Sequence, residues 1–314
     1  MADTTFFSWM SYRPHILFHA SGDQNDVGHY LPDEKIYRFV FDLWHTSADD
    51  IVAYHQQWKS LRPQHRLFHV VNEFTIGRQV AARGVPVVYA HQNCLLDETV
   101  FNIHFDVVRT FDAVYNGRMA EFKRHELLTD VPNSLIIGGI VTWDDSQERF
   151  DEVKRMLPHA TFTHGEDNQH LISEEVACAL SSARVGVCLS AVEGGMYAAT
   201  EYLLCGLPVV STPSLGGRDA WFDPRFTRVV PPRPEAVAAA VQELIDLDLD
   251  PRFVRNETMS RMVEHRRVFC DAVQEIYLAE EIGRDFTRDF YTNFRNKGGN
   301  WRYSKDVLEG FNPA

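Results

Sequence analysis

The sequence predicts an α/β protein with parallel sheets. Short apolar runs typical of buried strands alternate with segments of helical periodicity along the chain. The chain has 314 residues, enough for two domains of ordinary size, and its hydrophobic content of 45% can supply a core to each. No internal repeat or low-complexity segment breaks the alternation. We therefore expect two α/β domains.

In the first half, a polar loop at residues 21–28 follows the first predicted strand. Ser47 and the acids after it are typical of a helix start, and this helix is expected to run to about Leu61. Gly84 is expected to close a second, short helix. The predicted strands of this half are residues 14–19, 67–71 and 85–90.

The second half has the same alternation, and the domain boundary is expected near residues 106–110. Its predicted strands are residues 111–115, 135–137 and 160–163, with two more beginning at Val185 and Val209. Its predicted helices are residues 147–157, 171–182 and 236–247, with another beginning at about Met196 and one or two more within residues 255–281.

Bulk properties exclude several classes of function. The net charge of −13 argues against a nucleic-acid partner, because lysine and arginine drive phosphate-backbone binding. No apolar run approaches the roughly 20 residues that span a bilayer. The amino terminus lacks the basic and apolar regions of a secretory signal, and five scattered cysteines form no Cys-x-x-Cys pair. We expect a cytoplasmic protein with reduced thiols.

The most informative segment runs from residue 185 to residue 212. Two acids, Glu193 and Glu201, lie between two strands of buried type, and Gly194-Gly195 leads into a helix that starts near Met196. A helix start at the carboxyl end of a strand offers backbone N–H groups and a partial positive charge to a phosphate. Carboxylates there accept hydrogen bonds strongly from sugar hydroxyls.

This pattern resembles the retaining nucleotide-sugar glycosyltransferases of the GT-B fold, those like glycosyltransferase family four. The family has two glutamates separated by seven residues, here Glu193 and Glu201. A Cys-Gly-Leu-Pro-Val-Val strand follows at residues 205–210, and then a Gly-Gly turn at Gly216 and Gly217.

The resemblance covers residues 110–230 and implies two Rossmann-like domains whose parallel sheets face each other across a cleft. The implied divisions are an acceptor-side domain at residues 1–108, shorter than the family's, and a nucleotide-sugar domain at residues 109–265. Residues 266–314 are expected to form helices and a tail that cross back to the first domain.

Arg118 and Lys123 occupy the family's Gly-Arg-x4-Lys position after Gly117. The resemblance implies that both hold the diphosphate, where fixed cations stabilise the charge of the leaving group. The adjacent Arg124 and His125 are candidates to share this role. The alternative for Arg118 and Lys123 is that both are solvated charges in the first turn of a helix, where they would oppose the helix dipole.

The resemblance further implies that Glu193 contacts hydroxyls of the donor sugar and that Glu201 contacts those of the ribose. The alternative for Glu201 is an ordinary helix-surface acid, but its flanks look buried, and a buried carboxylate needs a partner. Met196 stands where the family often has glycine, which indicates a different fit around the sugar. The predicted donor-binding residues are Arg118, Lys123, His164, Gly165, Glu193, Gly194, Gly195, Met196, Tyr197 and Glu201.

His91 ends the Val-Pro-Val-Val-Tyr-Ala segment of the first half, and in the family such a histidine faces the donor sugar. The alternative is a structural histidine, one of fourteen in the chain. The predicted catalytic residues are His91, Arg118, Lys123 and Glu193.

Asp-Leu-Asp-Leu-Asp at residues 246–250 invites a metal-site interpretation, but it precedes Pro251 after a predicted helix, and a solvated turn is preferred. The tail at residues 284–303 has phenylalanines every four positions, a helical stripe. Packing on the first domain is preferred there over peripheral membrane contact.

The predicted function is glycosyl transfer from a nucleoside-diphosphate sugar to a hydroxyl acceptor, a saccharide or small molecule. The resemblance implies retention of configuration and no metal or other cofactor, the nucleotide sugar being a substrate. Three alternatives stay open: a sugar-nucleotide epimerase, a phosphorylase, and a degenerate binding or scaffold protein on the same fold. The sequence leaves the nucleotide, the sugar, the acceptor and the oligomeric state open.

Overall fold

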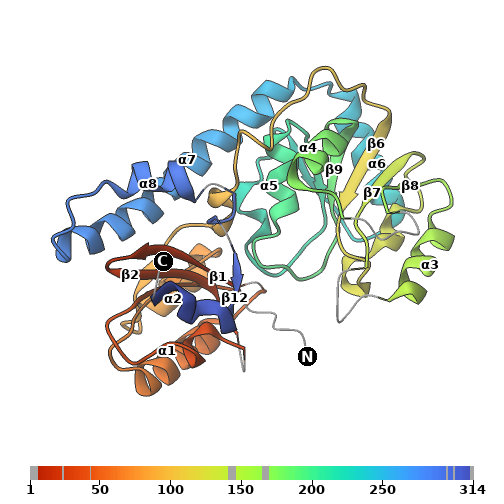
Figure 1. Cartoon of the computed structure of the whole chain (residues 1–314). Coiled ribbons are helices and arrows are strands. Elements are labelled where there is room, and N and C mark those ends of the chain that lie inside the picture. Colours follow the sequence, from red (N-terminus) through yellow and green to blue (C-terminus); the bar gives the residue numbers. More distant parts are fainter. Residues whose placement is uncertain are drawn as a thin grey trace. The chain divides into compact units, whose positions relative to one another are not determined.

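The chain folds into two compact units, shown in the computed structural model of Figure 1. The structure describes residues 6–22, 25–42, 44–140, 146–164, 170–294, 296–299 and 301–311. The first unit consists of Met1–Asp97 and Met262–Ala314, and the second consists of Glu98–Arg261. A six-stranded sheet lies in each unit, and the expectation of two α/β domains with parallel sheets is confirmed.

In the first unit, strands β2 to β5 run parallel, and β1 pairs antiparallel with β2 and β12. The sequence analysis missed β1, β3 and the two-residue strand β12. Strand β1 includes Ser8 and Ser11, and β3 has Arg38 near its centre, so neither of these two strands is an apolar run in the sequence. The strands in sheet order are β12 (Arg302–Tyr303), β1 (Phe6–Tyr12), β2 (His15–Ala20), β3 (Tyr37–Phe41), β4 (Arg66–Val70) and β5 (Val87–Val88).

Helices α1 (Ala48–Leu61) and α2 (Phe74–Ala81) connect these strands. Ser47 caps α1 as predicted, because its hydroxyl accepts a 3.2 Å hydrogen bond from the backbone N–H of Asp50. Gly84 follows α2 with a φ of 77°, a left-handed conformation that favours glycine.

The carboxyl-terminal segment adds the end of α7 (Pro251–Ala279) and α8 (Phe286–Asn293) to the first unit. Phe286 and Phe290 are buried, and both pack against Phe269 of α7 with ring centroids 6.4 and 6.5 Å apart. The phenylalanine stripe is therefore a packing face, as preferred from the sequence. Across the part of the chain that the structure describes, no helix combines the length and apolar character needed to cross a bilayer.

In the second unit the sheet is parallel throughout, and β6 lies beside β9 near its centre. The strands in sheet order are β11 (Thr227–Val229), β10 (Val209–Ser211), β9 (Ala183–Cys188), β6 (Phe111–Asn116), β7 (Ser134–Ile137) and β8 (Thr161–Phe162). The helices of this unit are α3 (Gln147–Met156), α4 (Ser173–Ser181), α5 (Tyr197–Leu204), α6 (Pro234–Asp246) and the first part of α7. All its strands except β11 are those predicted.

A buried ion pair organises the first unit. Asp26 and Arg38 are both fully buried, and Arg38 Nη2 donates to Asp26 Oδ1 at 2.7 Å. The Tyr54 hydroxyl donates to the other carboxylate oxygen at 2.5 Å, and the backbone N–H of Gly28 donates to Oδ1 at 2.8 Å. Trp58 stacks on the guanidinium at 4.6 Å. These contacts fix the loop after β2, because a buried carboxylate needs cationic or hydrogen-bonding partners.

Three buried histidines surround this pair. His19 accepts a 3.1 Å hydrogen bond from Arg38 Nε, while His69 lies 3.2 Å from the ring of His55. Burial lowers the pKa of His19 and of His65 to about 4 and that of His69 to about 3. All three are neutral in the folded chain at neutral pH.

We expect stability to fall as the pH drops from about 7 to about 4. Histidines of the unfolded chain bind protons near pH 6.5, whereas those of the folded chain bind them only near pH 3 to 4. Below pH 6.5 protons therefore favour the unfolded state, by about 2 kcal/mol per histidine at pH 5. Urea unfolding at pH 7.5 and pH 5, followed by tryptophan fluorescence, measures this loss.

The His69→Gln variant should lose less stability between these two pH values than the original chain does. His159→Gln, which changes an exposed histidine of the second unit, serves as the control and should leave the pH dependence unchanged. Equal pH dependence in His69→Gln and in the original chain would contradict the assignment.

Candidate functional site

The candidate site lies at the carboxyl ends of β6 and β9. The strand order of the second sheet reverses between these two strands, because β7 and β8 extend to one side and β10 and β11 to the other. Ligands of open parallel sheets bind at such a reversal. The loop after β6 carries Arg118 and leads to Lys123, and the loop after β9 carries Glu193.

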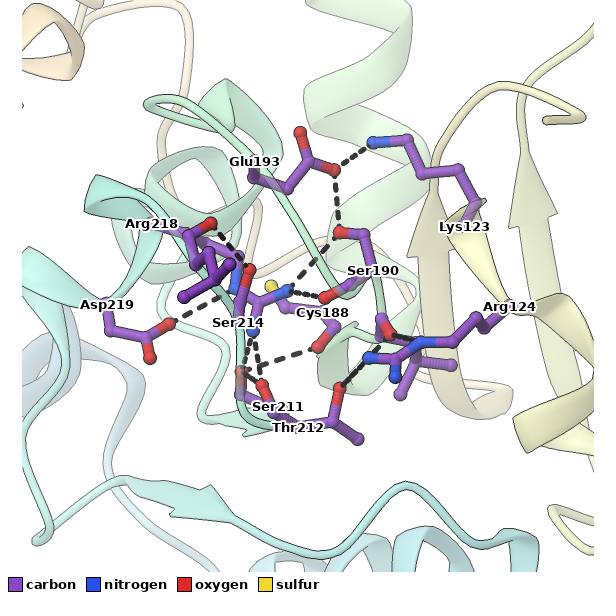
Figure 2. Close-up of polar contacts among 12 residues, drawn as sticks. Lys123, Arg124, Cys188, Ser190, Glu193, Ser211, Thr212, Ser214, Arg218 and Asp219 are labelled. Atoms are coloured by element: carbon purple, nitrogen blue, oxygen red, sulfur yellow. Dashed lines mark hydrogen bonds and ion pairs between the residues drawn. The ribbon is translucent and has the colours of Figure 1, made fainter. Parts of the chain in front are cut away.

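Lys123 and Glu193 form a buried ion pair at this place. Figure 2 shows the Glu193 carboxylate between the Lys123 ammonium and the Ser190 hydroxyl. Glu193 Oε1 contacts Lys123 Nζ and accepts a 2.6 Å hydrogen bond from Ser190 Oγ. The side chains of Lys123 and Glu193 are only 10% and 9% exposed, so each depends on the other for charge compensation.

The backbone at Lys123 differs from the alternative interpretation, which placed Arg118 and Lys123 in the first turn of a helix. Arg118 lies in a loop, and Lys123 ends the 3₁₀ helix η3 (Glu121–Lys123). Arg124 follows with a φ of 53°, a left-handed conformation that stops the helix. The Tyr115 hydroxyl donates a 2.6 Å hydrogen bond to the Lys123 carbonyl and so fixes this turn.

Arg118 is half-buried on the loop after β6. Its guanidinium lies 5.6 Å from the ring centroid of Phe122, which the Lys123 ammonium approaches at 5.1 Å. The two predicted diphosphate ligands therefore share one aromatic neighbour.

Arg124 holds the ends of two strands together. Its Nε donates to the Leu189 carbonyl at 2.5 Å, and its Nη2 donates to Thr212 Oγ1 at 2.7 Å. These contacts assign Arg124 to positioning the loops after β9 and β10. His125 is fully buried, with its ring 5.0 Å from that of Tyr115, and burial lowers its pKa to about 3. The hypothesis that His125 shares the cationic role is therefore wrong.

Arg218 is the residue that sequence reasoning missed most clearly. It is fully buried, and Nη1 donates to the Ser190 carbonyl at 2.8 Å while Nη2 donates to Ser211 Oγ at 2.9 Å and contacts the Thr212 carbonyl (Figure 2). It fixes the backbone of Ser190, whose hydroxyl contacts Glu193. Its signal in the sequence is its position directly after the Gly216-Gly217 turn.

The start of α5 is the predicted anion-binding end. Gly194, Gly195 and Met196 are buried, and Met196 precedes the helix with a φ of 42° and makes no side-chain capping bond. The backbone N–H of Glu193 donates to the Leu215 carbonyl at 2.9 Å, which fixes the loop before the helix. The predicted helix start near Met196 is confirmed, with Tyr197 as its first residue.

Glu201 lies one turn into α5 and is 4% exposed. Asn116, the last residue of β6, donates from Nδ2 to Glu201 Oε2 at 3.1 Å, and its backbone N–H donates to the Tyr202 hydroxyl at 2.6 Å. The surface-acid alternative is therefore wrong for Glu201. Asn116 and Tyr202 are site residues that the sequence analysis did not single out.

Glycines bring the loops after β6 and β7 together. A Cβ on Gly138, whose φ is 154°, would lie 2.0 Å from the Gly117 carbonyl oxygen. His164 is buried, and a Cβ on Gly139 would lie 1.9 Å from its Nε2. His164 thus packs directly on the loop after β7. Gly165, also predicted to bind the donor, lies outside the described residues.

His91 belongs to the first unit and is buried. Its Nδ1 accepts a 3.1 Å hydrogen bond from the backbone N–H of Asn93, and its own backbone N–H donates to His265 Nδ1 at 3.1 Å. This geometry gives His91 a capping role at the 3₁₀ helix η2 (Gln92–Leu95).

Two further groups have no evident role in chemistry. Burial raises the pKa of the Cys188 thiol to about 12, so it is neutral and a poor nucleophile. Asp246, Asp248 and Asp250 are exposed, and Asp250 caps the start of α7 by accepting from the backbone N–H of Arg252 at 2.9 Å. The preferred interpretation as a solvated turn agrees with this geometry.

Comparison with protein families finds one match in the second unit. Residues 112–247 match the model described as Glycosyl transferases group 1. This match confirms the predicted resemblance to a glycosyltransferase family over these residues. Comparison with curated protein sequences finds no match.

Solved glycosyltransferase structures share the fold at low sequence identity. Sucrose-phosphate synthase from Thermosynechococcus elongatus is 18% identical with a TM-score of 0.54, over 79% of this chain and 68% of that one. HepE of Anabaena in complex with UDP is 11% identical with a TM-score of 0.57, over 77% and 72%. The pneumococcal O-GlcNAc transferase GtfA in complex with UDP and GlcNAc is 13% identical with a TM-score of 0.57, over 77% and 53%. The chain therefore has the GT-B fold expected from its sequence.

We expect Lys123 and Glu193 to be strongly coupled in stability. Lys123→Met or Glu193→Gln alone should lower the free energy of unfolding by about 3 kcal/mol, because each leaves a buried group without its partner. The double variant should lose clearly less than the sum of the two. Urea unfolding of the four proteins gives the coupling energy.

Lys154→Met is the matched control, because Lys154 is exposed on α3 of the same unit. It should change stability little, and its effect should add to that of Glu193→Gln. If the losses in the free energy of unfolding caused by Lys123→Met and Glu193→Gln simply add in the double variant, the ion pair has no coupling energy.

Proposed function

We propose that the protein is a glycosyltransferase that moves a sugar from a nucleoside-diphosphate sugar to a hydroxyl acceptor. The observation that carries this proposal is the buried contact of Lys123 with Glu193 beside the start of α5. A cation, a carboxylate and a helix amino terminus meet there, which suits a ligand that carries both phosphates and hydroxyls. The family match over residues 112–247 supports the same reaction class.

In the proposed mechanism, Lys123 and Arg118 stabilise the charge that develops on the leaving diphosphate. The backbone N–H groups at Gly194, Gly195 and Met196 add to this stabilisation at the start of α5. Because these groups are held before the donor binds, they require little reorganisation during the reaction.

The two glutamates would orient the donor. Glu193 would accept hydrogen bonds from hydroxyls of the transferred sugar while still contacting Lys123, which joins sugar recognition to the phosphate site. Glu201, held by Asn116 at the end of β6, would accept from the ribose hydroxyls. Ser190 and Arg218 act as positioning residues, because they hold Glu193 and its loop.

We further propose that transfer retains the anomeric configuration, as the resemblance implies. We also propose that it needs no metal ion, because Lys123 and Arg118 supply the positive charge. His91 would contact the donor sugar from the first unit, as the resemblance implies, and His164 would lie near the nucleotide. UDP is the first nucleotide to test, since the structures of HepE and GtfA hold it. A cytoplasmic location fits the five free cysteines.

Nucleotide binding should depend on Arg118. Calorimetry and thermal unfolding with UDP, GDP, ADP, CMP and dTDP should identify one ligand that raises the unfolding midpoint, because a ligand of the native state must stabilise it. Arg118→Ala should weaken that binding about tenfold or more, since it removes a charge-assisted contact to phosphate. Arg155→Ala, an exposed arginine of α3, should bind like the original chain.

Binding of none of the nucleotides would favour the degenerate-scaffold alternative over an enzyme. Binding that is equal in Arg118→Ala and in the original chain would remove Arg118 from the site while leaving the nucleotide class standing.

Transfer should require both members of the buried pair. Glu193→Ala and Lys123→Ala should each lower the rate about 100-fold or more, because each removes a group aimed at the transition state. Transfer of radiolabelled sugar to an acceptor panel measures the rate, and circular dichroism checks that the variants stay folded.

Addition of EDTA should leave the rate unchanged, and NMR of the product should show the donor's anomeric configuration.

A further inference from the structure

A cavity lies in the first unit, and none of its lining residues belongs to the candidate site. Its volume is about 380 Å³, within the range of small-molecule pockets, and it is bounded by the antiparallel edge strand β1, by α8 and by β12. Ser11, Tyr12, Asn293, Arg284, Asp289 and Arg302 contribute polar groups to its wall.

The charge of this cavity is opposite to that of the chain as a whole. Two arginines and one aspartate line it, whereas the whole chain has a net charge of −13. Arg284 Nη2 donates to Ser11 Oγ at 3.1 Å and to the Tyr277 hydroxyl at 2.9 Å, and its Nε lies 3.7 Å from Asp289 Oδ2. Arg284 is therefore held in place, and Asp289 balances its charge.

Arg302 supplies the remaining positive charge. It lies on β12 opposite Phe7, and its Nη1 is 3.5 Å from Glu309 Oε2. The side chains of Arg302 and Glu309 are 44% and 71% exposed, and such surface pairs contribute little free energy. An anion in the cavity can therefore replace Glu309 as the partner of Arg302 at small cost.

The rest of the wall suits hydroxyl groups. Ser11 and Tyr12 offer hydroxyls, Asn293 offers an amide, and Phe294 adds an aromatic surface. A wall that combines hydroxyls, an amide and an aromatic ring suits a sugar, which has hydroxyl edges and an apolar face. The arginines match a single carboxylate or phosphate on that sugar.

We propose that this cavity binds a small hydroxylated anion, a sugar acid or a sugar phosphate, with Arg302 as the main anion ligand and Arg284 as its fixed neighbour. None of the cavity's residues is among those to which we assign a role in the proposed transferase reaction.

Calorimetric titration of the full chain with glucuronate, glucose 6-phosphate and glucose tests the proposal. At least one of the two anions should bind, and glucose should bind at least about tenfold more weakly, because it lacks the charged group. Which anion binds more tightly distinguishes a carboxylate site from a phosphate site. Arg302→Gln should weaken binding about tenfold or more, and Tyr12→Phe should weaken it by a smaller factor while keeping the aromatic ring.

Arg288→Gln is the matched control, since it removes the same charge from an exposed position on α8 outside the cavity. It should bind like the original chain, and binding should persist in Lys123→Ala, which alters the second unit. The proposal is overturned if neither anion binds, if glucose binds equally well, if Arg302→Gln binds like the original chain, or if Lys123→Ala fails to bind although circular dichroism shows that it is folded.

Discussion

Backbone carbonyl groups at the carboxyl ends of β9 and β10 need hydrogen-bond donors where the strands stop pairing, and buried arginines supply them. Arg218 reaches the carbonyls of Ser190 and Thr212, and Arg124 reaches that of Leu189. A guanidinium can serve several acceptors at once because its donors spread in a plane. The loops after these strands are thereby fixed without regular secondary structure, and the orientation of Ser190 and then of Glu193 follows from them.

Each unit has a buried ion pair, and the two pairs differ in their role. In the first, Asp26 and Arg38 are saturated by partners within the unit, so the pair organises a loop and a core. In the second, Lys123 and Glu193 keep a little exposure and have few other partners among the contacts described, at the place where the sheet order reverses. The first arrangement is closed to a ligand, whereas the second retains the capacity to exchange partners.

The sequence was sufficient to predict the α/β class and most strands of the second unit, because local motifs with fixed spacing encode these features. It also assigned Lys123 and Glu193 to one site, and the structure brings the two side chains into contact. It was insufficient for β1 and β3, whose serines and arginine are matched by partners distant in the chain. Arg218 was missed for the same reason: its three backbone and hydroxyl partners are visible only once β9 and β10 lie side by side. The 3₁₀ turn at Lys123 depends on the left-handed backbone conformation of Arg124. The identity of this residue does not predict that conformation.

The first unit is discontinuous in the sequence, since Met262–Ala314 completes what Met1–Asp97 begins. Strand β1 can therefore pair with β12 only after almost 300 further residues have been synthesised. All of the second unit is synthesised before β12. Domains fold as units when their chain is available. On the ribosome the second unit can thus be complete while the first unit still exposes an unpaired strand edge. The first unit is then the last to finish folding and the one most in need of protection from aggregation.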